Sequence, residues 1–366
     1  MSSPLRAVIA DDSALYRAVL TRAFSSIEGV EVVAQASNGA EAVDLVKRFS
    51  PDLLTLDLNM PKLDGLGTLR ALRDARIVCE VIIVSSETRQ GASATMEALQ
   101  LGAVDFITKP AEESSAVSSE VLGNELRRQM AAIRLRRDRR QLREPSAANT
   151  PKIPARAPSV SIPLPVEPTI RLVPEIIAIG VSTGGPAALP QLLGGLPAKL
   201  GAPIVLVQHM PPLFTASLAE SLAKKCPLRV EEGHNGQLVS SGCVYIAPGG
   251  HHMKVKRAFN NSVRLEISDE PPENHCRPAV DVLFRSVAQE YGGRVIAVIL
   301  TGMGNDGVAG LRVLKGLGAR VIAQDEASCT VFGMPQEAIR AAVVDVVLPL
   351  NRIADALVSA IHPNGY

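Results

Sequence analysis

The sequence of 366 residues contains no tryptophan, and aromatic residues make up only 3% of it. A surface that stacks single-stranded bases needs several exposed aromatic side chains, so this composition argues against that class of protein. An excess of charge of one sign is also absent, since the formal net charge is +1. Without a global electrostatic field, we expect neither nucleic acid nor a membrane surface as a partner.

Cysteine is scarce and scattered, with five residues and no C-x-x-C pair. We therefore expect neither a disulfide framework nor a zinc cage. Long apolar runs are missing too, because none approaches the roughly 18 residues of a membrane span. The short apolar run that ends at Asp11-Asp12 does not have the pattern of a signal peptide. These absences predict a soluble, cytoplasmic protein without membrane insertion.

Proline, in contrast, is concentrated in one stretch, since residues 144–174 hold eight of the 26 prolines. Proline-rich chain is extended and semi-stiff, which predicts a linker between two folded parts. At about 100–200 residues per domain, the length also fits two domains. We place the first domain at residues 1–125, a helical and proline-rich linker at 126–173, and the second domain at 174–363.

An arginine-rich segment precedes the prolines. Residues 127–143 carry eight arginines and a single acid, Asp138. A nucleic-acid patch and a solvated helix end are both compatible with such a segment. We favour the helix end, because no recognition motif and no aromatic residue accompanies the arginines.

Short apolar runs alternate with helical patterns on both sides of the linker, which predicts parallel strands joined by crossover helices. We therefore expect an α/β protein of two doubly wound domains with mainly parallel sheets. In the first domain, helices are expected at 13–24 and 39–49, and strands at 7–10, 30–34, 53–56, 81–84 and 105–107. In the second, a β-hairpin is expected at 253–267, and strands at 176–179, 204–207, 244–246, 295–300 and 321–323.

Carboxylates follow two of the strands predicted in the first domain. Asp11 and Asp12 end the first strand and Asp57 ends the third, so all three are expected at the sheet edge where ligands bind. Three carboxylates suit a hard divalent cation such as Mg²⁺. The fourth strand ends in Ser85 and the fifth in Lys109, which add a hydroxyl and an ammonium group. This combination predicts a phosphoryl-acceptor site in which the Asp57 carboxylate attacks phosphorus.

A serine stands where a strand of the second domain is expected to turn into a helix. Residues 180–184, Gly-Val-Ser-Thr-Gly, match G-x-S-x-G, in which small neighbours permit a sharp turn that exposes the serine oxygen. A phosphate-binding or packing turn would satisfy the same short pattern. Ser182 is therefore a candidate nucleophile that needs a base nearby.

His209 is the candidate base, because it ends the next predicted strand and so shares a sheet edge with Ser182. His251 and His252 could reach this edge from a loop, but no third ligand is spaced to make them a metal site. Asp306 follows a later strand of the same sheet and could orient His209. The order serine, histidine, acid differs from the order in α/β-hydrolases, so we expect a different sheet arrangement.

The loop around Asp306 also matches a second motif. Gly302, Gly304 and Gly307 spell G-x-G-x-x-G after a predicted strand, and Asp325 follows where a ribose-binding acid would be sought. A dinucleotide-binding oxidoreductase is therefore one alternative, although such a fingerprint usually opens its domain. A non-enzymatic signalling adaptor or a DNA-binding regulator that uses the arginine-rich segment is the other.

The first domain resembles the receiver domain of bacterial response regulators over residues 4–125. The likeness rests on the acid pair, the stretch Asp57-Leu-Asn-Met-Pro-Lys-Leu-Asp-Gly65, and the strand-end serine and lysine. It implies a flavodoxin-like fold and phosphorylation of Asp57 by a chemotaxis histidine kinase. It also implies Mg²⁺ held by Asp11, Asp12 and Asp57, a switch hydroxyl on Ser85, and phosphate contact by Lys109.

The second domain is similar to the catalytic domain of chemotaxis protein-glutamate methylesterases over residues 174–362. Four motifs carry the likeness in order: Gly-Val-Ser-Thr-Gly-Gly-Pro (180–186), Gln-His-Met-Pro (208–211), Ala-Pro-Gly-Gly-His (247–251) and Leu-Thr-Gly-Met-Gly-Asn-Asp-Gly (300–307). One departure is Ala279, where the family pattern leads us to expect serine.

This second resemblance implies a Rossmann-like domain with Ser182 as nucleophile, His209 as general base and acid, and Asp306 as the residue that orients it. The backbone N–H of Met303, together with Thr183, would stabilise the oxyanion. It implies hydrolysis of glutamate methyl esters, and of glutamine amides, on the cytoplasmic helices of methyl-accepting chemoreceptors, without a cofactor. Phosphorylation of the receiver is expected to uncover the esterase site.

Overall fold

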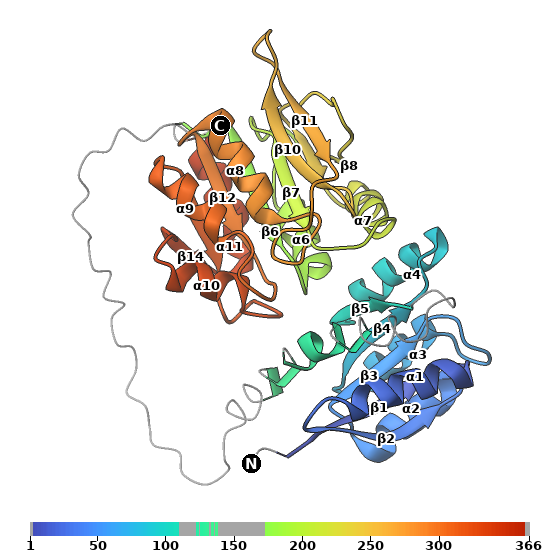
Figure 1. The fold of residues 1–366 in the computed structure, drawn as a ribbon. Helices are drawn as coiled ribbons and strands as arrows, with labels where there is room; N and C mark the ends of the chain where they lie inside the picture. Colours follow the sequence, from blue (N-terminus) through green and yellow to red (C-terminus); the bar gives the residue numbers. More distant parts are fainter. Residues whose placement is uncertain are drawn as a thin grey trace.

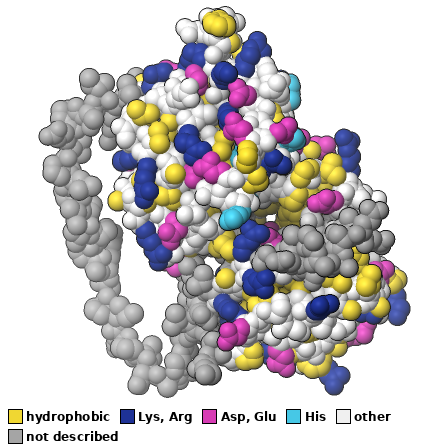
Figure 2. Space-filling view, in the orientation of Figure 1, with side chains coloured by type: hydrophobic (Ala, Val, Ile, Leu, Met, Phe, Trp, Pro, Cys, Tyr) yellow, Lys and Arg dark blue, Asp and Glu magenta, His cyan; other side chains and the backbone are white. Residues whose placement is uncertain are grey.

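Two α/β halves make up the chain (Figure 1). The computed structural model describes residues 3–109 and 173–362, together with residues 122–137 except positions 124, 132 and 135. Most of the predicted linker, including its proline-rich part, therefore lies outside the described residues. Acidic and basic side chains are intermingled over the face drawn in Figure 2, in keeping with the small net charge.

The first half is a five-stranded parallel sheet with the strand order β2-β1-β3-β4-β5. This is the order of a flavodoxin-like doubly wound fold, so that prediction is confirmed. Every strand predicted for this half is present. The strands are β1 (Leu5–Ala10), β2 (Val30–Ala36), β3 (Leu53–Asp57), β4 (Glu80–Ser85) and β5 (Asp105–Thr108), and the helices are α1 (Ala14–Ser25), α2 (Gly39–Phe49), α3 (Gly65–Asp74) and α4 (Arg89–Gln100).

The second half is built on a seven-stranded parallel sheet with the order β14-β13-β12-β6-β7-β9-β8. Its strands are β6 (Ile176–Val181), β7 (Ile204–Gln208), β8 (Arg229–Glu232), β9 (Cys243–Ile246), β12 (Val295–Ile299), β13 (Arg320–Gln324) and β14 (Val346–Leu348). The predicted hairpin is present as β10 (His252–Arg257) antiparallel to β11 (Val263–Ser268). The two edge strands, β8 and β14, were not predicted, because both are short and β8 is largely charged.

Helices cover both faces of this second sheet and bury its apolar strands. One face packs against α6 (Gly185–Gly194), α7 (Phe214–Ala223) and α11 (Leu350–Ile361). The other packs against α8 (Val280–Tyr291), α9 (Val308–Gly316), α10 (Met334–Arg340) and the hairpin. The doubly wound fold predicted for this half is therefore confirmed.

The chain winds in opposite directions from the central strand β6. It proceeds through β7 towards one edge of the sheet and later through β12 towards the other edge. Ligands of such sheets bind at this point of reversal, beyond the carboxyl ends of the strands. The loops after β6, β7 and β12 are therefore the place to look for a site.

The two halves meet where α4 and β5 face α6 and α7 (Figure 1). The ring of Phe106 in β5 stacks on Phe214 in α7, with the centroids 4.4 Å apart. The side chain of Gln100 in α4 donates to the Ser221 hydroxyl at 2.6 Å. One continuous apolar cluster runs through both halves at this junction.

Residues 122–137 are helical where they are described, and Leu126, Met130 and Ile133 are buried against the first sheet. Arginines of this segment contact the first half as well: Arg136 lies 3.2 Å from Glu80, and Arg137 donates to the Ser3 carbonyl at 2.9 Å. These arginines are thus held against the protein. Within the described parts of the chain, no helix is both long and apolar enough to cross a membrane.

Candidate active site

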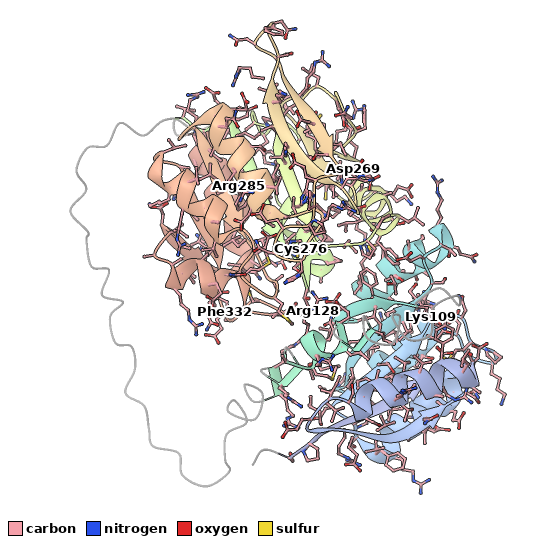
Figure 3. The ribbon with its side chains drawn as sticks, in the orientation of Figure 1. Lys109, Arg128, Asp269, Cys276, Arg285 and Phe332 are labelled. Carbon is pink, nitrogen blue, oxygen red and sulfur yellow. The ribbon has the colours of Figure 1, made fainter. Side chains whose placement is uncertain are left out.

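Three carboxylates meet at the carboxyl edge of the first sheet. Ligand oxygens of Asp11, Asp12 and Asp57 all lie within 4.8 Å of one another. The Nζ atom of Lys109 (Figure 3) lies 2.9 Å from an oxygen of Asp57 and 2.9 Å from one of Asp11. Burial raises the pKa of Asp57, while the hydrogen bond and the charge of Lys109 act in the opposite direction. The result is a compact cluster of three carboxylates with the ammonium group of Lys109 beside two of them.

This oxygen donor set fits a hard divalent cation such as Mg²⁺, which prefers carboxylates and water. Such a cation would supply positive charge to a phosphoryl group. Ser85 is buried at the same edge, and its hydroxyl donates to the Gly91 carbonyl at 3.3 Å. The structure thus gathers all the residues predicted for the phosphoryl site, while their individual roles stay predictions.

Ser182 lies in the turn between β6 and α6. Its backbone N–H donates to the Thr301 carbonyl at 3.0 Å, and its carbonyl accepts from the Gly185 N–H at 2.8 Å. Gly184 adopts φ +83°, a conformation that favours glycine, and the helix starts at the next residue. This turn holds the serine at the carboxyl end of the central strand.

A hydrogen bond joins His209, which follows β7, to Asp306, which follows β12. Nε2 of His209 lies 2.8 Å from Oδ2 of Asp306, whose residue is only 3% exposed. The same carboxylate accepts from the backbone N–H groups of Val280 and Asp281 at 2.7 and 3.0 Å, and from Nδ2 of Asn274 at 3.1 Å. These contacts stabilise the ionised carboxylate and fix its orientation.

Burial alone would lower the pKa of His209, but hydrogen bonds and charge interactions with Asp306 and Cys276 raise it to about 9. Burial acts to raise the pKa of Asp306, yet its contacts with His209 and the two backbone N–H groups hold that pKa below the usual range. Because Asp306 engages Nε2, the ring nitrogen that faces away from the carboxylate is Nδ1, and Sγ of Cys276 lies 3.8 Å from it.

Ser182, His209 and Asp306 line one cavity of about 1210 Å³, to which Asp105 of the first half also contributes. Within the described residues, no hydrogen bond joins the Ser182 hydroxyl to His209. Catalytic hydrogen bonds often tighten only when substrate binds. The structure therefore brings the three predicted residues together, and forms the histidine–carboxylate contact but not the serine–histidine one.

The two predicted oxyanion donors differ in their surroundings. Met303 lines the cavity, and no described residue accepts a hydrogen bond from its backbone N–H. The Thr183 hydroxyl, in contrast, donates to Oδ2 of Asp105 in β5 at 2.7 Å. Burial raises the pKa of Asp105, against the hydrogen bonds from Thr183 and Gln129. Of the two predicted donors, Thr183 thus already donates its hydroxyl hydrogen bond to the first half.

The glycine loop between β12 and α9 packs closely against the serine turn. A Cβ atom at Gly302 would lie 2.7 Å from Cβ of Ser182, so a larger residue there requires the loop to move. Gly304 and Gly307 adopt φ +89° and +98°. Asp325, the other part of the dinucleotide pattern, accepts locally from the Ser328 N–H at 3.0 Å. Close packing and turn geometry account for the glycine spacing without a dinucleotide.

Two residues of this site were missed by the sequence reasoning. Asn274 Nδ2 bridges Asp306 and Asp281, at 3.1 and 2.9 Å. Cys276 Sγ lies 3.8 Å from Nδ1 of His209, close to the junction of the halves (Figure 3). Both residues belong to the loop between β11 and α8, which has no periodic pattern, so no signal in the sequence placed them beside His209.

The paired histidines of the hairpin have structural partners. His251 is paired with Asp269. The buried His252 ring accepts the Ala279 N–H at Nδ1, at 3.2 Å, and Nε2 contacts the Pro271 carbonyl at 3.1 Å. Ala279, the departure from the family pattern, is itself fully buried and precedes α8.

Comparison with known proteins covers both halves. Residues 177–357 match the CheB methylesterase family, and residues 7–119 match the response regulator receiver domain. A protein-glutamate methylesterase/protein-glutamine glutaminase of Desulfotalea psychrophila is 43% identical over 365 residues, with 98% of each chain covered. A relative of the same name from Trichodesmium erythraeum is 41% identical over 97% of this chain and 99% of its own. Among solved structures, the CheB methylesterase catalytic domain of Thermotoga maritima is 45% identical with a TM-score of 0.50, and covers 51% of this chain and 98% of that one.

Proposed function

Because the chain belongs to the protein-glutamate methylesterases/protein-glutamine glutaminases that carry a response regulator receiver domain, we propose that it hydrolyses glutamate methyl esters on methyl-accepting chemoreceptors. It also hydrolyses glutamine amides there, and both reactions reset the receptors in chemotaxis adaptation. The observation that carries the proposal is the 2.8 Å contact between His209 and Asp306 in the cavity that Ser182 also lines.

In the first step, Oγ of Ser182 attacks the ester carbonyl carbon, and Nδ1 of His209 takes the serine proton. The tetrahedral oxyanion lies near the backbone N–H of Met303, which offers a donor that no described residue occupies. Asp306 accepts from Nε2–H and stabilises the imidazolium that forms. The intermediate collapses when His209 returns the proton to the leaving oxygen, and methanol departs.

In the second step, water attacks the acyl-enzyme while His209 takes one of its protons. The proton then passes to Oγ of Ser182, the ester bond to the enzyme breaks, and a free glutamate side chain remains on the receptor. A glutamine substrate follows the same route, except that ammonia leaves in place of methanol.

Methanol release from methylated receptor membranes tests this assignment. Ser182→Ala and His209→Ala should each lower the rate by at least about 10³-fold, because the nucleophile and its base act as one unit. Ser359→Ala and His234→Ala are matched controls at exposed positions and should keep the full rate. If either active-site variant keeps substantial turnover with its fold intact, Ser182 or His209 does not have the proposed role.

Control by the receiver follows from the docked arrangement of the halves. The stack of Phe106 on Phe214 and the hydrogen bond from Thr183 to Asp105 set β5 against the esterase cavity. In this arrangement the receiver restricts access of a receptor helix to Ser182. Phosphorylation shifts the population towards an undocked form with an open cavity.

The phosphoryl group comes from a chemotaxis histidine kinase and is accepted by a carboxylate oxygen of Asp57. Asp11, Asp12 and Asp57 would hold Mg²⁺, which supplies charge neutralisation at this site. Lys109 exchanges its ion pair with Asp57 for contact with the phosphoryl oxygens, and the Ser85 hydroxyl turns towards the same group.

A further inference from the structure

Cys276 occupies a position for which the proposed ester hydrolysis has no use. Its thiol is half-buried at the cavity, and Sγ lies 3.8 Å from Nδ1 of His209. This ring nitrogen is the one that Asp306 leaves free, since the carboxylate engages Nε2. A thiol and an imidazole nitrogen therefore face each other where the serine proton must pass.

The spacing of these two atoms is that of a metal-binding pair. Zinc–nitrogen bonds are about 2.0–2.1 Å long and zinc–sulfur bonds about 2.3 Å, so a tetrahedral angle separates the two ligand atoms by about 3.6 Å. The observed separation of 3.8 Å is close to this value. The separation of the two ligand atoms therefore already suits an ion bound between Cys276 and His209.

The residues around the pair already hold both ligands in place. Histidines that bind a metal usually donate their other ring N–H to a carboxylate, and Asp306 provides this contact at 2.8 Å. Backbone hydrogen bonds between Cys276 and Glu273, at 2.8 and 3.1 Å, close the turn that carries the thiol. The His209 N–H donates to the Val181 carbonyl at 3.2 Å, which fixes the base of the imidazole side chain.

We propose that Cys276 and His209 form an inhibitory site for a thiophilic divalent cation, of which Zn²⁺ is the representative. The cation binds the Cys276 thiolate and Nδ1 of His209, the thiol proton passes to solvent, and oxygen ligands from the cavity complete the coordination. Nε2–H continues to donate to Asp306. The Nδ1 lone pair is then occupied, so His209 is unable to take the proton of Ser182. The proposal of metal binding uses only the positions of Cys276 and His209, whereas the proposal of inhibition rests on the proposed function.

Binding is tested on the full-length protein with Co²⁺, whose thiolate complexes show a charge-transfer absorption band in the near ultraviolet. With excess Mg²⁺ present to occupy the carboxylates of the first half, we expect this band in the wild type, with one thiolate-bound Co²⁺ per chain at saturation, and its displacement by Zn²⁺. Cys276→Ser should abolish the band, and the matched variant Cys226→Ser should keep it. Asp306→Asn should weaken Co²⁺ binding by roughly 10- to 100-fold, because it replaces the charged acceptor of Nε2–H with a neutral amide.

Methanol release is then measured with and without Zn²⁺, each variant serving as its own reference. Zn²⁺ should inhibit the wild type, a chelator should restore the rate, and Cys276→Ser should lose the sensitivity. The site is overturned if the wild type gives no band, or if the band survives in Cys276→Ser. A band without inhibition would support the metal site but would show that His209 is not the general base. Ser182→Ala should show the band whether or not the proposed esterase mechanism holds.

Discussion

Asp306 is the residue on which the esterase site depends most directly. It accepts from an imidazole, two backbone N–H groups and the Asn274 amide while it is almost fully buried. An amide at this position could not accept from all these donors, because one of its two atoms is itself a donor. The carboxylate therefore sets both the orientation and the proton affinity of His209.

We expect Asp306→Asn to lower kcat by about 10⁴-fold, the loss typical when the carboxylate of a catalytic triad becomes an amide. The pH profile should also change. His209 acts as a base only when it is neutral, and contacts with Asp306 and Cys276 raise its pKa to about 9. The wild-type kcat/KM should therefore rise with pH up to about 9, and the rising limb should move to lower pH in the variant.

The control for this experiment is Asp325→Asn, which changes an acid that follows β13 and contacts Ser328 outside the cavity. Its rate and pH profile should match those of the wild type. An unshifted rising limb in Asp306→Asn would assign the orienting role to another residue.

At the scale of elements, the loops after β6, β7 and β12 carry the site, and this is why much of it could be predicted. Ser182, His209 and Asp306 each follow a buried apolar strand, and parallel strands bring their carboxyl ends to one edge. The edge strands β8 and β14 were missed because they are short and largely polar or exposed. Cys276 and Asn274 were missed because the sequence of their loop has no hydrophobic periodicity from which its position could be predicted.

The packing of the glycine loop on the serine turn gives a prediction at the same scale. We expect Gly302→Ala to lower kcat by roughly 10²-fold, because a shift of about 1 Å in a catalytic group is enough for such a loss. The added Cβ would meet Cβ of Ser182 at 2.7 Å and Sδ of Met334 at 2.4 Å. Steady-state methanol release, with thermal unfolding as a check on the fold, measures this.

Gly316→Ala is the matched control, since it lies in α9 and its added Cβ would meet nothing within 4 Å. It should keep the full rate and leave stability unchanged or raised by up to about 1 kcal/mol. Equal rates for the two alanine variants would show that the close approach at Gly302 does not position Ser182.

At the scale of the whole molecule, the arrangement of the two halves lay beyond what the sequence could predict. It depends on contacts between residues far apart in the chain, such as Phe106 with Phe214 and Thr183 with Asp105. Each of these side chains also fits a local role, in a strand, a helix or the turn that carries Ser182. No pattern within either half indicates that they contact one another.

Weakening this junction should raise the activity of the unphosphorylated protein. An aromatic pair contributes about 0.5–1.5 kcal/mol beyond the area it buries, so loss of the stack alone in Phe106→Ala should increase the undocked population roughly 2- to 10-fold, and the lost apolar contact should add to this increase. Methanol release without a phosphodonor should rise at least about 2-fold. Removal of residues 1–140 should raise it further, because the docked form is then impossible.

Leu15→Ala serves as the control, because Leu15 is 66% exposed on α1 and its side chain packs little. Its basal rate should equal that of the wild type. A loss of activity after removal of residues 1–140 would mean that the receiver activates the esterase half and does not restrain it.

Strand β5 joins the two sites physically. Lys109, directly after its last residue, pairs with Asp57, and Asp105, its first residue, accepts from Thr183, the neighbour of Ser182. At about 3.3 Å per residue, the four residues of this strand span about 13 Å. A signal at the phosphoryl group therefore does not need a long relay through the core. If phosphorylation draws Lys109 away from Asp57, we expect the hydrogen bond from Thr183 to Asp105 at the other end of the same strand to weaken.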